Sequence, residues 1–177
     1  VKLHYGIEFK EYSILLFHPV TTEVDQVAAQ IQTVIEAAKR SNLKFLVIFP
    51  NNDLGSSVII DAYGSLPKNF RVIPSMRFEF FLTTLKECQL ILGNSSAGVR
   101  EAPYFGVPAI NIGNRQNDRT DVASVFNVEF NEDLIMAHIL KLSSKNFVPV
   151  ESFGSNGTAG RFMGLINSVN QGAGVQK

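Results

Sequence analysis

Short apolar runs alternate along this chain with longer stretches in which apolar residues recur every three or four positions. Residues 13–17 and 44–49 are almost continuously apolar, as strands buried on both faces of a sheet are. Between them, residues 24–39 carry apolar side chains at the spacing of one helix face. A strand buried on both faces needs helices above and below it, so this alternation predicts an α/β domain with a parallel sheet.

The pattern continues to about residue 169 and predicts one well-cored domain. We expect strands at 13–17, 44–49, 70–73, 89–92, 108–112 and 127–130, and helices at 24–39, 56–63, 78–85, from about 99, 134–142 and 158–169. Residues 143–157 are rich in Ser, Asn, Pro and Gly and predict a surface connection. This order predicts an open, doubly wound, Rossmann-like parallel sheet of about six strands, with ligands outside the carboxyl ends of the strands.

The composition argues against several function classes. The chain has 16 Lys and Arg residues and 16 Asp and Glu residues, so no overall basic charge draws it to nucleic acid or to an anionic membrane. One cysteine and three scattered histidines give no disulfide framework and no zinc spacing, and we expect neither a metal nor a cofactor. No apolar run approaches the roughly 20 residues of a membrane helix. We therefore expect a cytoplasmic protein.

Polar residues gather directly after the predicted strands, where the carboxyl ends of parallel strands meet at one edge. They are His18, 51–53, 93–98 and 113–118. The run 93–98 combines small residues with two hydroxyls ahead of a helix, which suits a phosphate. Alternatively, Ser95 or Ser96 only caps the helix and Gly98 forms a tight turn. No Gly-Lys-Ser/Thr follows, so the run is not a Walker A loop.

Several single residues near this edge also have two interpretations. Glu101 offers two acceptor oxygens that suit the vicinal hydroxyls of a ribose, or it is a surface carboxylate favoured by the helix dipole. His18 is a candidate general acid or phosphate ligand, or a structural histidine. Arg115 or Arg119 pairs with phosphate, or each carries a solvated loop charge. Asn51 orients a ligand or makes an Asx turn.

Four segments in the same order resemble one family closely, namely residues 18–22, 49–56, 93–101 and 106–116. Together they are similar to the C-terminal domain of the UDP-N-acetylglucosamine 2-epimerases. The Asn94-Ser95-Ser96 run and the Asn-Ile-Gly-Asn-Arg-Gln run of 111–116 resemble the hydrolysing branch in particular. The resemblance covers about residues 13–170.

The resemblance implies the C-terminal half of a two-domain, GT-B-type enzyme that holds a UDP-sugar in the cleft between its domains. The N-terminal half would be a partner domain of the same enzyme, and the parent a homo-oligomer. We expect residues 1–12 to be a linker, 13–170 the nucleotide-binding domain and 171–177 a disordered tail. The implied site roles are Ser95 and Ser96 for the diphosphate, Glu101 for the ribose, Arg115 for a phosphate, His18 for the diphosphate or sugar, Asn51 in the cleft, and Ser75 and Met76 for the uracil.

The reaction implied by the resemblance removes the proton at sugar C2, eliminates UDP to a 2-acetamidoglucal and adds water. The product is a free 2-epimeric sugar, usually N-acetylmannosamine, for sialic-acid-type biosynthesis. Acidic residues of the N-terminal domain are expected to move the protons, so this chain is expected to be inactive alone. The alternative is the UDP-sugar-binding domain of a GT-B glycosyltransferase. A flavodoxin-like or receiver-like module fits less well, because the first strand ends in neither an acidic cluster nor a Thr/Ser-rich loop.

Overall fold

A six-stranded, fully parallel sheet forms the centre of the protein in the computed structural model, which describes residues 1–154 and 157–172. The strand order is β3-β2-β1-β4-β5-β6. The bounds are β1 Ser13–Leu16, β2 Phe45–Ile48, β3 Phe70–Ile73, β4 Ile91–Gly93, β5 Ala109–Ile112 and β6 Val125–Val128. The prediction of a doubly wound α/β sheet of about six strands is confirmed.

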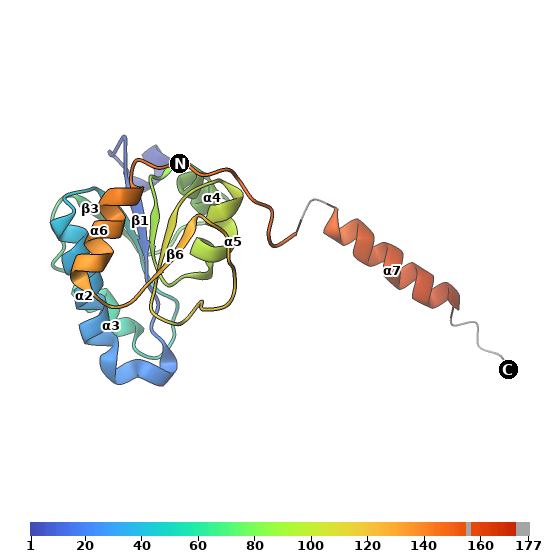
Figure 1. Cartoon of the computed structure of the whole chain (residues 1–177), viewed down its shortest axis with the longest axis horizontal. Helices are drawn as coiled ribbons and strands as arrows, with labels where there is room; N and C mark the ends of the chain where they lie inside the picture. Colours follow the sequence, from blue (N-terminus) through green and yellow to red (C-terminus); the bar gives the residue numbers. More distant parts are fainter. Residues whose placement is uncertain (155–156, 173–177) are drawn as a thin grey trace.

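Helices cover both faces of the sheet (Figure 1). One face carries α2 Val27–Arg40, α3 Ser56–Tyr63 and α6 Glu132–Leu142, and the other carries α4 Phe78–Glu87 and α5 Ser96–Tyr104. Alternate strand residues serve the two cores: Leu15 belongs to the α2 side, whereas Ile14 and Leu16 belong to the α4 side. This two-sided burial explains why the strands read as continuous apolar runs.

The order of the strands reverses at β1, which pairs with β2 on one side and with β4 on the other. In doubly wound sheets, ligands bind outside the carboxyl ends of the strands at such a switch point. Leu16 lies opposite Gly93 at this end. Gly93 has φ 139°, and a Cβ there would lie 2.0 Å from the Leu16 carbonyl oxygen. Only glycine therefore lets the two strands pair up to the edge where the loops diverge.

Some local details differ from the sequence-based expectation. Helix α5 starts at Ser96, so Gly98 lies inside a helix and forms no tight turn. Strand β6 lies two residues earlier than expected, because Phe130 leaves the strand and packs edge-to-face on Phe17 with ring centroids 6.0 Å apart. A 3₁₀ segment, η1 Thr21–Gln26, precedes α2, and no side chain caps it.

The first 12 residues pack onto the domain. A one-turn helix, α1 Lys2–Tyr5, leads to Ile7 and Tyr12, which are both buried in the core on the α4 side. The Tyr12 hydroxyl donates to the Thr84 carbonyl at 3.0 Å. The interpretation of 1–12 as an interdomain linker stays a prediction about a longer protein.

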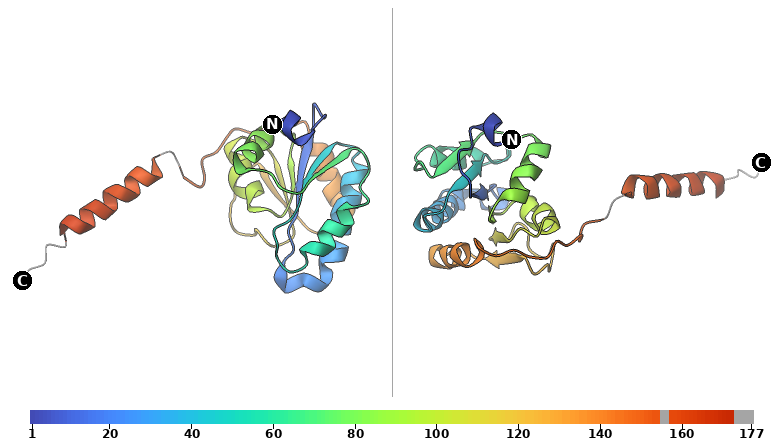
Figure 2. Two further views of the ribbon diagram at one scale, coloured as in Figure 1. Left: turned by 180° about the vertical axis from the view of Figure 1, so that it is seen from behind. Right: turned by 90° about the horizontal axis from the view of Figure 1, so that it is seen from above.

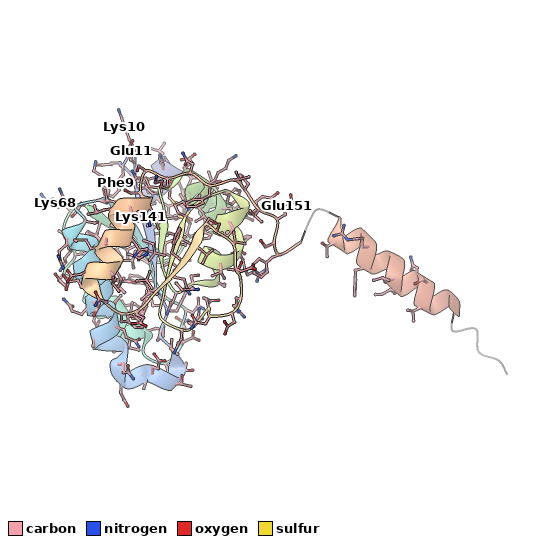
Figure 3. The ribbon with its side chains drawn as sticks, in the orientation of Figure 1. Phe9, Lys10, Glu11, Lys68, Lys141 and Glu151 are labelled. Atoms are coloured by element: carbon pink, nitrogen blue, oxygen red, sulfur yellow. The ribbon has the colours of Figure 1, made fainter. Side chains whose placement is uncertain are left out.

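Helix α7, Thr158–Gly172, projects away from the sheet domain in every view (Figures 1 and 2). Before it, the chain runs along the end of α5, where the Phe147 N–H donates to the Gly106 carbonyl and the Val150 N–H to the Pro103 carbonyl. Figure 3 shows Glu151 on the stretch that then leaves the domain. Of the predicted tail 171–177, residues 171–172 continue α7 and the remainder lies outside the described residues.

The apolar side chains of α7 are all exposed; they are Phe162, Met163, Leu165, Ile166 and Val169. Within the described ranges, no helix has both the length and the apolar character needed to span a bilayer.

Candidate functional site

A cleft of about 360 Å³ opens at the carboxyl edge of the sheet, next to the switch point between β1 and β4. Its volume lies in the usual range of ligand pockets, about 300–1,000 Å³. The predicted site residues that line it are His18, Asn51, Met76, Ser95, Ser96, Glu101 and Arg115. Ser75 lies elsewhere, in a separate cavity with His4 and Tyr5. Its proposed contact with the uracil is therefore not supported by its position.

Asn94 fastens the ends of β1 and β4 together. Its Oδ1 accepts from the His18 main-chain N–H at 2.7 Å, and its Nδ2 donates to the His18 carbonyl at 2.8 Å. The side chain thus continues the strand pairing one step beyond Gly93, and only 1% of Asn94 is exposed. From the sequence, Asn94 was expected only as part of the loop 93–98, with no role of its own. A buried amide directly after a strand at the switch point is the signal that could have identified it.

The imidazole of His18 is held in one tautomer. Its Nδ1 accepts from the Asn51 main-chain N–H at 3.1 Å, so the proton of the neutral ring is on Nε2. The pKa of His18 is lowered from 6.5 to about 4, mainly by burial and then by the positive charge of Arg115, while the carboxylate of Asp53 opposes both effects. At neutral pH, His18 is therefore an uncharged hydrogen-bond donor at the cleft. Asn51 contributes its main chain to this arrangement, and the Ser56 hydroxyl donates to its carbonyl.

The N-terminus of α5 forms the floor of the cleft beside His18. Ser95 is the N-cap, and its Oγ accepts from the Ala97 N–H at 3.3 Å. Ser96 is the first helical residue and also lines the cleft. A helix N-terminus presents main-chain N–H groups and a partial positive charge, which favour an anionic ligand. Ser95 therefore caps the helix, as one of its two interpretations proposed. This cap is compatible with the other interpretation, in which the helix N-terminus binds an anion.

Arg115 brings a cation to the same N-terminus. Its Nη1 donates to the Asn94 carbonyl at 3.1 Å, and Nε2 of the buried Gln116 donates to the same oxygen at 3.0 Å. None of the ion pairs in the described part of the chain involves Arg115. Arg119 does not line the cleft; it donates to the Gln116 Oε1 at 2.9 Å and so braces the loop. Of the two candidate arginines, only Arg115 lines the cleft.

Glu101 lies just over one turn into α5 and lines the cleft together with an apolar wall formed by Met76, Phe78 and Phe81. Its side chain is 25% exposed, and its Oε1 lies 3.9 Å from the Arg100 Nε, a long contact between adjacent residues. The carboxylate therefore retains acceptor capacity for hydroxyl groups. The cleft as a whole offers an anion site, an acceptor for hydroxyls and an apolar wall with one thioether and two aromatic rings.

The strand order and this edge define a Rossmann-like α/β domain. Comparison with known proteins identifies it further: the chain belongs to the UDP-N-acetylglucosamine 2-epimerase family, whose sequence model matches residues 2–167. A UDP-N-acetylglucosamine 2-epimerase of Neisseria meningitidis serogroup B is 39% identical over 131 residues, which are 73% of this chain and 35% of that protein. A hydrolysing UDP-N,N'-diacetylbacillosamine 2-epimerase of Legionella pneumophila is 32% identical over 164 residues, 90% of this chain and 43% of that protein.

Solved structures of such enzymes share the fold. A UDP-GlcNAc 2-epimerase of Methanocaldococcus jannaschii, in complex with UDP-GlcNAc and UDP, matches with a TM-score of 0.75 at 17% identity, over 94% of this chain and 48% of that one. The enzyme of Neisseria meningitidis, bound to UDP-GlcNAc, matches with a TM-score of 0.73 at 15% identity, over 94% and 49% of the two chains. The chain thus spans less than half the length of these relatives.

Proposed function

We propose that this chain is the UDP-binding half of a hydrolysing UDP-N-acetylglucosamine 2-epimerase. The observation that carries the proposal is the meeting of Arg115, the α5 N-terminus and Glu101 in one cleft at the switch point. A diphosphate suits the first two groups, and the hydroxyls of the attached ribose suit Glu101, which lies five residues after Ser96 on the helix. The hydrolysing branch is supported by the relative from Legionella, which carries that activity in its name.

Each group in the cleft then has one task. Ser96, the free N–H groups of α5 and Arg115 bind the diphosphate, with Ser95 fixing the helix end. Glu101 accepts hydrogen bonds from the ribose hydroxyls. Met76 and the neighbouring aromatic wall contact the uracil. His18 donates from Nε2 to a diphosphate or sugar oxygen, because its Nδ1 is already occupied by the Asn51 N–H.

The chemical step proposed for the full-length parent is an elimination followed by a hydration. The proton at sugar C2 leaves to a base, the bond from C1 to the diphosphate oxygen breaks, and UDP departs with the bonding electron pair. Water then adds across the resulting 2-acetamidoglucal to give free N-acetylmannosamine or a close analogue. Negative charge grows on the departing diphosphate, where Arg115 and the helix dipole stabilise it. The base is assigned to the other domain, so the chain alone is expected to be inactive.

Titration calorimetry of the 177-residue chain with UDP and with uridine tests the assignment. We expect UDP to bind more tightly than uridine, and Glu101→Ala to weaken both ligands by about 1.5–3 kcal/mol, because both carry the ribose. Glu11→Ala is the matched control, since Glu11 is exposed near the amino ends of the strands (Figure 3).

Unchanged UDP affinity in Glu101→Ala would contradict the ribose assignment. For the full-length enzyme, release of free 2-acetamido sugar from UDP-GlcNAc without any acceptor supports the proposed reaction. Sugar transfer that depends on an acceptor would instead indicate a glycosyltransferase.

A further inference from the structure

The segment 74–77 lies between the cleft and the N-terminal helix α1. On one side, Met76 and the following Phe78 line the cleft. On the other side, Ser75 lines a separate cavity that α1 helps to form. The contacts between α1 and this segment therefore bear on the shape of the cleft wall.

Tyr5, the last residue of α1, holds the segment through its side chain. Its hydroxyl oxygen accepts from the Arg77 main-chain N–H at 3.1 Å. Arg77 is the N-cap of α4 and stands in the sequence between Met76 and Phe78. The Tyr5 ring also packs edge-to-face on Phe80, with centroids 6.0 Å apart, and α1 lies beside α4 (Figures 1 and 2). The hydrogen bond thus fixes the main chain directly between two side chains of the cleft wall.

Tyr5 is itself fixed by strand β3 and by the core. Nε and Nη2 of Arg71 both donate to the Tyr5 main-chain carbonyl, at 3.3 and 3.0 Å. Gly6 follows with φ 60°, and a Cβ there would lie 3.1 Å from the Arg71 Nη2. Glycine therefore ends α1 and leaves room for the guanidinium. The next residue, Ile7, is buried in the core on the α4 side.

The position of the cleft wall matters because dispersion contacts depend steeply on distance. A gap of about 0.5–1 Å forfeits about a quarter to a half of the contact energy. We propose that Tyr5 is a positioning residue for base recognition, because its hydroxyl holds the wall of Met76 and Phe78 at contact distance from the base. Tyr5 itself does not line the cleft. The inference rests on the proposed function, in which this wall contacts the uracil.

Tyr5→Phe tests the inference, because it keeps the ring against Phe80 and removes only the hydroxyl. In calorimetric titrations of the 177-residue chain, UDP and uridine should both bind about fivefold more weakly, within the range for the loss of one neutral hydrogen bond. Pyrophosphate carries neither base nor ribose, and its affinity should stay at the parent value. Tyr104→Phe is the matched control, since Tyr104 is 44% exposed and does not line the cleft.

Methyl NMR supplies a readout that a merely structural role would not move. The chain has three methionines, Met76, Met136 and Met163, so each methyl signal can be assigned by substitution. In the ligand-free Tyr5→Phe variant, the Met76 signal should shift or broaden, whereas the signals of Met136 and Met163 should stay in place. Addition of UDP should move the Met76 signal of the parent chain, and pyrophosphate should move it much less.

A second variant acts on the other side of Tyr5. Arg71→Met keeps an unbranched apolar stem and removes both hydrogen bonds to the Tyr5 carbonyl. It should weaken UDP and uridine in the same direction as Tyr5→Phe and leave pyrophosphate unchanged.

The titrations separate failure of this inference from failure of the proposed function. Absence of UDP binding by the parent chain would overturn the proposed function and this inference with it. If the parent chain binds UDP and the affinity is unchanged in both Tyr5→Phe and Arg71→Met, this inference alone is overturned. An equal loss of affinity for pyrophosphate would also overturn it, because Tyr5 would then act on the domain as a whole and not on the base.

Discussion

The main-chain N–H and carbonyl of His18 both bond to the side-chain amide of Asn94, 76 residues further along the chain. The Asn94 amide thus makes the two hydrogen bonds that a neighbouring strand would make, at the point where the strand order reverses. Its own carbonyl receives Arg115 and Gln116. Asn94 therefore helps to fix the positions of both the His18 imidazole and the Arg115 guanidinium in the cleft.

Replacing this amide should destabilise the domain strongly. Asn94→Ala leaves the N–H and the carbonyl of the buried His18 without partners, and we expect a loss of about 2–4 kcal/mol in the free energy of unfolding. Urea denaturation measures this loss as a lower midpoint at unchanged slope. The control is Asn52→Ala at an exposed residue nearby, which should change the stability by less than about 0.5 kcal/mol. Equal urea midpoints for the two variants would show that the Asn94 amide does not contribute this stability.

The stability of the domain should fall in mild acid because of His18. The pKa of its imidazole is 6.5 in the unfolded chain and about 4 in the folded protein, so between these pH values the unfolded chain binds more protons. The contribution is complete above about pH 6.5 and is lost as the pH falls toward 4, by up to about 3 kcal/mol.

The variant His18→Asn isolates this effect from that of the carboxylates. An Asn side chain offers an acceptor near the position of Nδ1 for the Asn51 N–H but does not titrate. Thermal unfolding at pH 7, 6 and 5 should therefore show a smaller loss of stability in the variant than in the parent chain. Parallel pH profiles would mean that His18 titrates normally in the folded state.

The two serines of the cleft should respond differently to substitution by alanine. Ser95→Ala removes the cap of α5 and should cost about 1 kcal/mol of stability as well as UDP affinity. Ser96→Ala should leave stability within about 0.5 kcal/mol. It should weaken UDP by about 1.5–3 kcal/mol and uridine very little, because only UDP carries the diphosphate. Calorimetric titration and thermal unfolding of the same samples give both values; equal losses for UDP and uridine would place Ser96 away from the phosphates.

Two neighbouring glycines provide a further comparison. Gly93→Ala places a Cβ 2.0 Å from the Leu16 carbonyl oxygen at φ 139°, and we expect a loss of more than about 3 kcal/mol or failure to fold. Gly98→Ala meets only ordinary contact, 3.5 Å from the Ala109 Cβ, inside a helix. Its stability should stay within about 1 kcal/mol of the parent, on the stabilising side, because alanine favours the helix. A well-folded Gly93→Ala variant would contradict the close strand approach.

Much of the architecture could be predicted because each buried strand is a visible apolar run. Strand β3 and helix α3 lie at the residues expected, 70–73 and 56–63. Strand β6 was displaced in the prediction because its first residues, Val125 and Phe126, are only partly buried, and Phe130 looks as strand-like as Val125. Local sequence patterns thus predict which segments are buried more accurately than they predict where a strand ends.

The candidate site shows the same division. The cleft residues could be predicted as a group because loops after parallel strands meet at one edge, and the family resemblance supplied their individual roles, which remain predictions. Local pattern does not identify the partner of Asn94, because His18 becomes its neighbour only through the strand order.

Helix α7 has a thermodynamic consequence for the isolated chain. An α-helix of 15 residues is marginal on its own in water, and this one places Phe162, Leu165, Ile166 and Val169 in solvent at helical spacing. The segment therefore forms a stable helix only to the extent that another surface covers these side chains. Far-ultraviolet circular dichroism should therefore report an equilibrium between an unfolded segment and a helix packed against another surface. If that surface belongs to a second copy of the chain, the helicity should rise with protein concentration.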